Sequence, residues 1–195
     1  MFPLGSVLFP HMPLHLRVFE QRYLIMLANL IKAAHPEFGV VLIERGREVG
    51  GGEYRFRTGT LAEVTDLGAQ EGFVGLAAVG RTRFEVVDWL TDDPHPRAEV
   101  RVLPELVWDQ RLEPRRTEAE RLVRRTLTAA SEFAQTWPAD LELSADPVAA
   151  VWQLAGITPV GELDQVRLLR STSMAELLDR IVEVTSDATV DFGSS

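Results

Sequence analysis

The spacing of apolar residues changes close to Pro104, and this change constrains the fold more than any other feature of the chain. Before Pro104, short apolar-rich runs are separated by turn residues, which is typical of β-strands. After it, apolar residues recur at helical spacing over longer stretches. Strands followed by helices predict an α+β chain in two parts. We place a β-rich part at residues 1–105 and a helical bundle, packed on the first part, at residues 106–195.

The apolar pattern of the first part predicts a small curled sheet or barrel with one inserted helix. A β-turn-β element is expected at the start, punctuated by prolines. Residues 19–34 have the apolar spacing of an amphipathic helix that begins with Phe19 on its apolar face, and residues 38–43 form a continuous apolar run of strand length. Four shorter strands follow, two of them separated by a turn at residues 80–82. Residues 45–54 are too rich in glycine and charge to form an element.

The apolar pattern of the second part predicts several packed helices. Residues 114–137 place their apolar side chains, including Phe133 and Trp137, on one face. Trp152 is expected in the core of a later helix that Gly156 ends. Three residue pairs with the chemistry of helix starts precede the later helices, namely Asp146–Pro147, Thr158–Pro159 and Ser173–Glu176.

Composition excludes several classes of function. The net charge of −9 opposes general attraction to nucleic acid, and the absence of cysteine removes thiolate metal sites and thiol nucleophiles. No segment approaches the roughly 20 apolar residues of a transmembrane helix, and no signal peptide is indicated. We therefore expect a cytoplasmic protein that does not bind a membrane.

The catalytic and cofactor motifs lack the structural context that they require. Residues 75–82 have the glycine spacing of a phosphate loop, but Arg81 stands where lysine is needed and a strand pattern follows. His11 and His15 are separated by a proline that makes a shared helical face implausible, so metal binding is not favoured. The only lysine, Lys32, has no serine nucleophile motif near it. We expect no enzymatic activity, no cofactor and no metal.

The run FPLGSVLFPHMPLHLRVFEQRYLIML resembles the opening of the Lon protease N-terminal, substrate-binding domain. The segments GVVLI, EVGGGEYRFRTGTLAEV and AVGRTRFEVVDW occur in the order of that family, and LDQVRLLRSTSMAELLDRIVE resembles its closing segment. The resemblance covers nearly the whole chain. Its most specific parts are Phe9-Pro10, Phe19-Glu20-x-Arg22-Tyr23, Gly59-Thr60 with Ala62, and Gly80-Arg81 with Phe84.

This resemblance implies a PUA-like pseudo-barrel followed by a helical bundle. It also implies a free-standing domain that lacks the ATPase module, with its Walker motifs, and the serine-lysine protease module of full-length Lon. Such a domain would be a non-catalytic binding or adaptor protein for polypeptide segments, including misfolded clients, or for a partner protein. The identity of the client, cooperation with a separate protease and the oligomeric state stay open.

Two groups of residues are candidates for contact with a client. Phe9, Met12 and Leu14 form an apolar stripe at the first turn, which is either core or an exposed patch. If it is exposed, Met12→Asp abolishes binding and leaves the melting temperature nearly unchanged. The resemblance carries over Arg17, Arg22, Tyr23 and Arg81 as positions that shape a cleft, although Arg22 and Arg81 equally suit structural ties.

RNA binding is the alternative from another class, because PUA-like folds elsewhere hold RNA. A local basic patch would be needed to overcome the negative net charge. The arginines that suit such a patch are Arg55, Arg57, Arg81 and Arg83.

Overall fold

The structure of the protein is a computed structural model, and it describes residues 1–44, 54–131 and 136–192. Most of the segment 45–54 therefore lies outside the described residues. The chain divides into two compact units, Met1–Glu105 and Leu106–Ser195. Unit 1 contains β1 (Phe2–Leu4), β2 (Pro13–Val18), α1 (Gln21–Leu30), β3 (Glu37–Glu44), β4 (Tyr54–Gln70), β5 (Phe73–Leu90) and β6 (Arg97–Val102).

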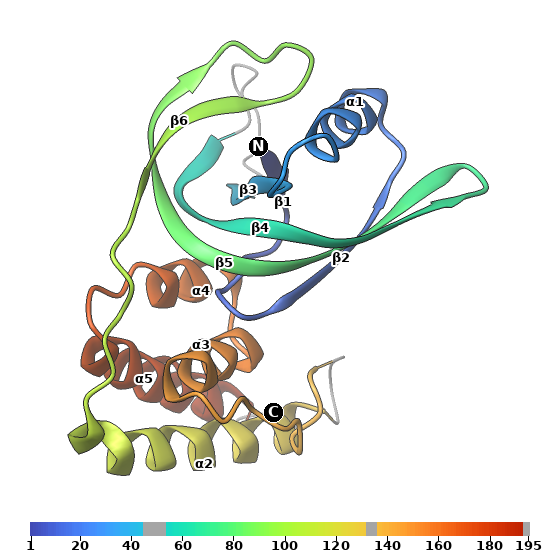
Figure 1. Ribbon diagram of the computed structural model, residues 1–195. Helices are drawn as coiled ribbons and strands as arrows, with labels where there is room; N and C mark the ends of the chain where they lie inside the picture. The colour runs from blue at the N-terminus through green and yellow to red at the C-terminus, as the bar shows by residue number, and fades with distance from the viewer. Residues whose placement is uncertain (45–53, 132–135, 193–195) are drawn as a thin grey trace. The chain divides into compact units, whose positions relative to one another are not determined.

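One six-stranded, mainly antiparallel sheet forms the body of unit 1 (Figure 1). Its strand order is β1-β3-β4-β5-β2, and β6 also pairs with β5. The two strands ahead of the helix do not pair with each other, because β1 lies parallel to β3 while β2 lies antiparallel to β5. The α+β class is therefore confirmed, but the sheet is curled and open, not a closed barrel.

Strand β5 is 18 residues long and replaces two strands that the sequence predicts separately. Strand β4 pairs with it along one edge, while β2 and β6 share the other edge. The expected turn at residues 80–82 is wrong, because these residues lie within the continuous strand β5. Gly80 is the point at which this strand closely approaches the backbone of Phe9. A Cβ atom on Gly80 would lie 2.1 Å from the carbonyl oxygen of Phe9.

Helix α1 contributes Tyr23, Met26 and Leu27 to the buried side of unit 1. The Tyr23 ring stacks on Phe2 with 4.0 Å between ring centroids. The expected helix over residues 19–34 is too long, because the backbone of Glu20 is still extended and α1 begins at Gln21. Phe19, expected on the apolar face, precedes the helix and is 70% exposed.

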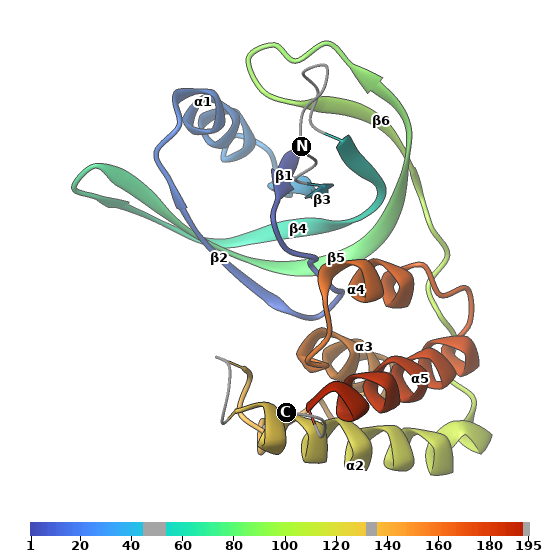
Figure 2. The ribbon, with the colours of Figure 1, turned by 180° about the vertical axis from the view of Figure 1, so that it is seen from behind.

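Unit 2 consists of packed helices, and α2 and α5 lie side by side in both views (Figures 1 and 2). Asp146 accepts a hydrogen bond from the backbone N–H of Ala149, at 2.8 Å, which confirms the expected cap. Gly156 does not end that helix, which continues to Ile157. The elements are η1 (Gln110–Leu112), α2 (Glu113–Ala130), α3 (Pro147–Ile157), α4 (Glu162–Leu169) and α5 (Met174–Phe192).

The two tryptophans expected in helical cores have different positions. Trp152 is buried in α3, as predicted. Trp137 is 40% exposed, because α2 ends at Ala130 and does not reach it. Phe133, expected on the same face, lies outside the described residues.

Replacing Gly80 by alanine should destabilise unit 1 by about 2–4 kcal/mol, because the new Cβ collides with a backbone oxygen that cannot rotate away. Urea denaturation of the wild type and the variant measures the difference. Gly68→Ala is the matched control, since its Cβ meets no atom within 4 Å, and it should change stability by no more than about 0.5 kcal/mol. Equal effects of the two substitutions would contradict the close approach at Gly80.

Candidate binding site

A shallow hollow of about 450 Å³ lies on β2, β4 and β5 in unit 1. It is an open surface feature, and all three of its strands belong to the same sheet. The residues around it are His15, Leu16, Arg17, Asp66, Gly68, Gln70, Phe73, Gly75, Leu76 and Ala77.

The centre of the hollow is a row of three residues across the strands. Gly75 of β5 lies opposite Arg17 of β2 on one side and opposite Gly68 of β4 on the other. Residues that lie directly opposite each other project to the same face of a sheet. Two of the three positions therefore carry no side chain, and the sheet surface is low there.

Among the described residues, nothing in the packing requires glycine at these two positions. A Cβ on Gly68 would meet no atom within 4 Å, and a Cβ on Gly75 would meet only the carbonyl oxygen of Gly68, at 3.5 Å. Such a contact is close to an ordinary van der Waals distance. The space above the two glycines is therefore open to another molecule.

The rim of the hollow carries opposite charges on its two sides. His15 and Arg17 project from β2, whereas Asp66 projects from β4, opposite Ala77 in the row next to the glycines. Two strand spacings separate these sides, which is roughly 9–10 Å. The Arg17 guanidinium lies over the Phe73 ring, 5.3 Å from its centroid. The site thus offers a small apolar floor between a cationic and an acidic rim.

Among the seven residues that the sequence suggests for contact with a client, only Arg17 lines this hollow. Phe9 is 2% exposed and Met12 is 6% exposed, so neither contributes to an exposed patch, and Leu14 is half-buried on β2. The alternative assignment of this turn, core packing, is correct for Phe9 and Met12. Its backbone is held by two distant strands: the Thr60 hydroxyl of β4 donates to the Leu8 carbonyl at 2.6 Å, and the N–H of His11 donates to the Gly80 carbonyl of β5 at 2.8 Å.

The other motif residues make contacts within unit 1. Arg22 pairs with Glu20 at 2.9 Å, and its guanidinium lies 4.7 Å from the centroid of the buried Tyr23 ring. Arg81 forms an ion pair with Glu63 on the neighbouring strand. None of Arg22, Tyr23 and Arg81 lines the hollow that Arg17 borders.

Sequence reasoning missed Gly68, Gly75 and Phe73, although a signal for them exists. Gln70 and Phe73 pair across a two-residue turn, and Gly72 in that turn has a φ of 84°. A short turn that contains such a glycine is typical of a β-hairpin. Counting outward from this turn places Gly68 opposite Gly75.

The four arginines of the expected RNA-binding patch are engaged with protein groups. Arg83 is 5% exposed and donates to the Pro104 carbonyl at 2.9 Å, and burial lowers the pKa of its guanidinium. Arg57 donates to two carbonyl oxygens of β5, and Arg81 pairs with Glu63. Arg55 forms two hydrogen bonds with Asp92, which hold the pKa of that carboxyl below its ordinary value. These contacts do not leave a shared basic surface.

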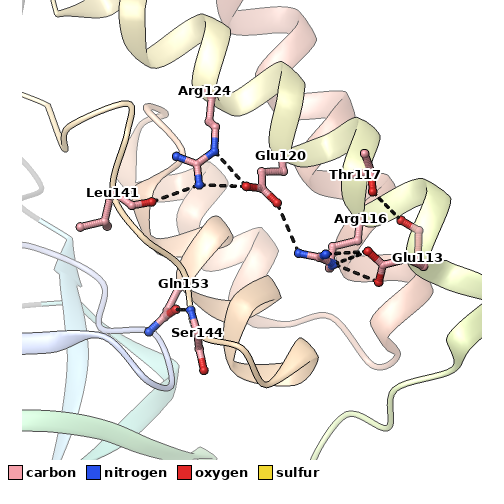
Figure 3. Close-up of polar contacts among 8 residues, drawn as sticks. All are labelled: Glu113, Arg116, Thr117, Glu120, Arg124, Leu141, Ser144 and Gln153. Carbon is pink, nitrogen blue, oxygen red and sulfur yellow. Dashed lines mark hydrogen bonds and ion pairs between the residues drawn. The ribbon is translucent and has the colours of Figure 1, made fainter.

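Unit 2 has a second hollow of about 810 Å³, between α2 and the segment that precedes α3. Figure 3 shows Arg116 between Glu113 and Glu120, and Arg124 between Glu120 and the Leu141 carbonyl. Arg124 also donates to the Ala139 carbonyl at 2.6 Å. The arginines therefore neutralise acidic neighbours and attach the segment to α2, which accounts for this cluster structurally.

The described residues hold neither a membrane-spanning helix nor a cluster of metal ligands. No helix among them combines the length and the apolar character that crossing a membrane requires. No three His, Cys, Asp or Glu side chains within the same ranges gather as a metal site would.

Comparisons with known proteins agree with this architecture. The family model described as the ATP-dependent protease La (LON) substrate-binding domain matches residues 1–187. A crystal structure of a Lon N-terminal domain protein from Xanthomonas campestris has a TM-score of 0.67 at 24% identity, covering 93% of this chain and 95% of that one. The N-terminal domain of Mycobacterium avium complex Lon protease has a TM-score of 0.66 at 15% identity, covering 95% and 96%. No curated protein sequence matches the chain.

Met12→Asp should unfold unit 1 or destabilise it by at least about 3 kcal/mol, because it places an unpaired carboxylate in the core. This outcome is the opposite of the one expected from an exposed turn. Thermal unfolding followed by circular dichroism measures it. His15→Asp on the exposed face of β2 is the control and should leave the melting temperature nearly unchanged, while a stable Met12→Asp would contradict the burial of this turn.

Arg83→Ala and Arg81→Ala should differ in their effect on stability. Removing Arg83 leaves the Pro104 carbonyl without its donor and should cost about 2 kcal/mol. Removing Arg81 breaks an ion pair whose side chains are 48% and 32% exposed, and should cost less than about 1 kcal/mol. Urea denaturation of both variants tests this difference, and an Arg81 effect as large as that of Arg83 would show that Arg81 is a structural tie.

Proposed function

Because this chain belongs to the ATP-dependent protease La (LON) substrate-binding domain family, we propose that it binds polypeptide segments at the hollow on β2, β4 and β5. The observation that carries this proposal is the pair Gly68 and Gly75, whose missing side chains leave an open floor without any packing reason. A floor of this kind accepts a side chain from another molecule. It accepts many side chains, since no deep wall restricts their shape.

The floor supplies weak and unspecific apolar contact. It consists of glycine backbone and the side chain of Ala77, with the Phe73 ring beside it. Burying about 100 Å² of apolar client surface there contributes roughly 2.5 kcal/mol. One such contact holds a client only briefly, so tight binding needs several contacts along the segment. That property suits a module that must release what it binds.

The rim supplies polar contact that does not depend on the client sequence. Arg17 can donate to the carbonyl groups of an extended segment, and Asp66 can accept from its N–H groups. Because every residue of a polypeptide except proline carries both groups, this arrangement favours any unfolded segment over a folded surface. Clients of this kind are unfolded proteins, and we place the module in the cytoplasm with them.

The proposed role involves binding without a chemical step. The residues that line the hollow include no serine, cysteine or lysine that could act as a nucleophile. A client bound in this way could be passed to a separate protease or held until it refolds. In both cases this module supplies recognition alone.

Gly75→Val tests the proposal, because it fills the hollow without disturbing the strand. Valine suits a β-strand, and its Cβ has room at this position. We expect the affinity for a reduced, carboxymethylated and fluorescently labelled protein to fall about tenfold or more, measured by fluorescence anisotropy, with the melting temperature unchanged.

Gly161→Val is the matched control for this experiment. It makes the same change at an exposed glycine in unit 2 where a Cβ meets nothing within 4 Å, and it should leave the affinity unchanged. Unchanged affinity in Gly75→Val would contradict the assignment of the hollow. Binding of single-stranded RNA that weakens steeply with salt, without binding of the unfolded protein, would instead support the nucleic-acid alternative.

A further inference from the structure

Strand β6 has one edge that no other described strand covers. It pairs with β5 alone, and Val100 and Val102 on it are 38% and 56% exposed. Their direct partners on β5, Val86 and Phe84, are almost completely buried. The apolar layer of the sheet therefore continues onto β6 and stops there half-exposed. An unpaired strand edge of this kind is a template for another strand.

The hydrogen-bond pattern shows which groups face outward from β6. The backbone N–H of Leu103 donates to the Arg83 carbonyl at 2.9 Å, so Leu103 faces β5. Facing and outward positions alternate in an antiparallel pair. Arg101 therefore faces β5 as well, whereas the N–H and C=O groups of Val100 and Val102 point to the open edge.

The sequence of β6 is complementary to itself in one antiparallel register. If Val100 of one chain lies opposite Val100 of a second copy, then Glu99 lies opposite Arg101 and Ala98 lies opposite Val102. The outward-facing residues then form the hydrogen-bonded pairs of the new ladder. Glu99 and Arg101 fall at the closer, non-hydrogen-bonded positions, where opposite charges attract most strongly.

The charges within unit 1 add a reason for this register. Glu99 lies opposite Asp88 of β5, and like charges in direct opposition destabilise a sheet. Arg101 already pairs with Glu85 of its own chain. An arginine from the far side of β6 would offset the repulsion at Glu99, and the self-complementary register places Arg101 of a second copy there.

We propose that β6 pairs antiparallel with β6 of a second copy, which joins the two sheets in a symmetric dimer. The interface is isologous, because each copy contributes the same strand and the symmetry axis passes beside Val100. It uses none of the residues that line the hollow, so this proposal and the proposed function succeed or fail separately. Since a single strand pair buries little surface, the dimer is weak, and the dimeric fraction rises with protein concentration.

A single cysteine tests the register directly, because the wild-type chain has none. Opposed hydrogen-bonded residues have Cα atoms about 5.5 Å apart, within the range of about 4.4–6.8 Å that a disulfide spans. Val100→Cys should therefore form a disulfide-linked dimer under mild oxidation, seen on a non-reducing gel. Val107→Cys, at a residue that is 83% exposed, is the control and should cross-link much more slowly. Equal rates would overturn the proposal.

A charge exchange tests the ion pairs. Glu99→Arg and Arg101→Glu should each weaken self-association about tenfold or more in sedimentation velocity, and an equimolar mixture of the two should recover it as a heterodimer. Glu99→Arg also removes the repulsion with Asp88, so its melting temperature should not fall, which separates pairing from folding. Glu71→Arg makes the same charge change at the β4–β5 turn and should leave association unchanged.

Three further results would overturn the proposal. One is a chain that stays monomeric at high concentration, and another is a dimer that is indifferent to both charge changes. The third is a Val100→Cys protein that stays monomeric but forms a disulfide with an added extended peptide that contains a cysteine. That result would assign this edge to client segments.

Discussion

The backbone of residues 8–12 lies directly against β4 and β5, and the arrangement of unit 1 depends on this contact. The N–H of His11 donates to the Gly80 carbonyl, and the N–H of Gly80 donates to the Met12 carbonyl. The approach is possible because residue 80 has no side chain. These bonds start the pairing of β2 with β5, and they set its register before the first residue of β2. Phe9 and Met12 are buried as part of the same contact.

The hollow results from the registers of two strand pairs that share β5, namely β2 with β5 and β4 with β5. The bonds at Gly80 place Arg17 opposite Gly75, and the short turn at Gly72 places Gly68 opposite Gly75 from the other side. A slip of one residue in either pairing would move the side chains of that strand to the opposite face. The low floor and its charged rim therefore come from pairing geometry, and no separate loop is needed to build them.

Local chemistry decided which parts of this architecture were predictable. Residues 38–43 and the Asp146 cap were recognisable, because a continuous apolar run and a capping side chain act over a few neighbouring residues. The length of β5 was not, since the approach of residues 8–12 to Gly80 joins positions far apart in the chain.

The residues of the candidate site were likewise predictable only in part. Arg17 was found through its motif, but the burial of Phe9 and Met12 depends on distant partners that spacing does not reveal. The opposition of Gly68 and Gly75 was within reach, because it follows from one short turn. The exposure of Phe19 was missed because helical spacing does not show where a helix begins.

The occupation of both edges of β5 determines the order in which unit 1 can come apart. Strand β4 covers one edge, and β2 and β6 share the other, so β5 can be released only after its neighbours have left. Strand β1 is three residues long and, among the described strands, pairs with β3 alone, so it can detach without disturbing that arrangement. Local opening thus begins at the margins of the sheet, and the amide protons of β5 exchange with solvent last.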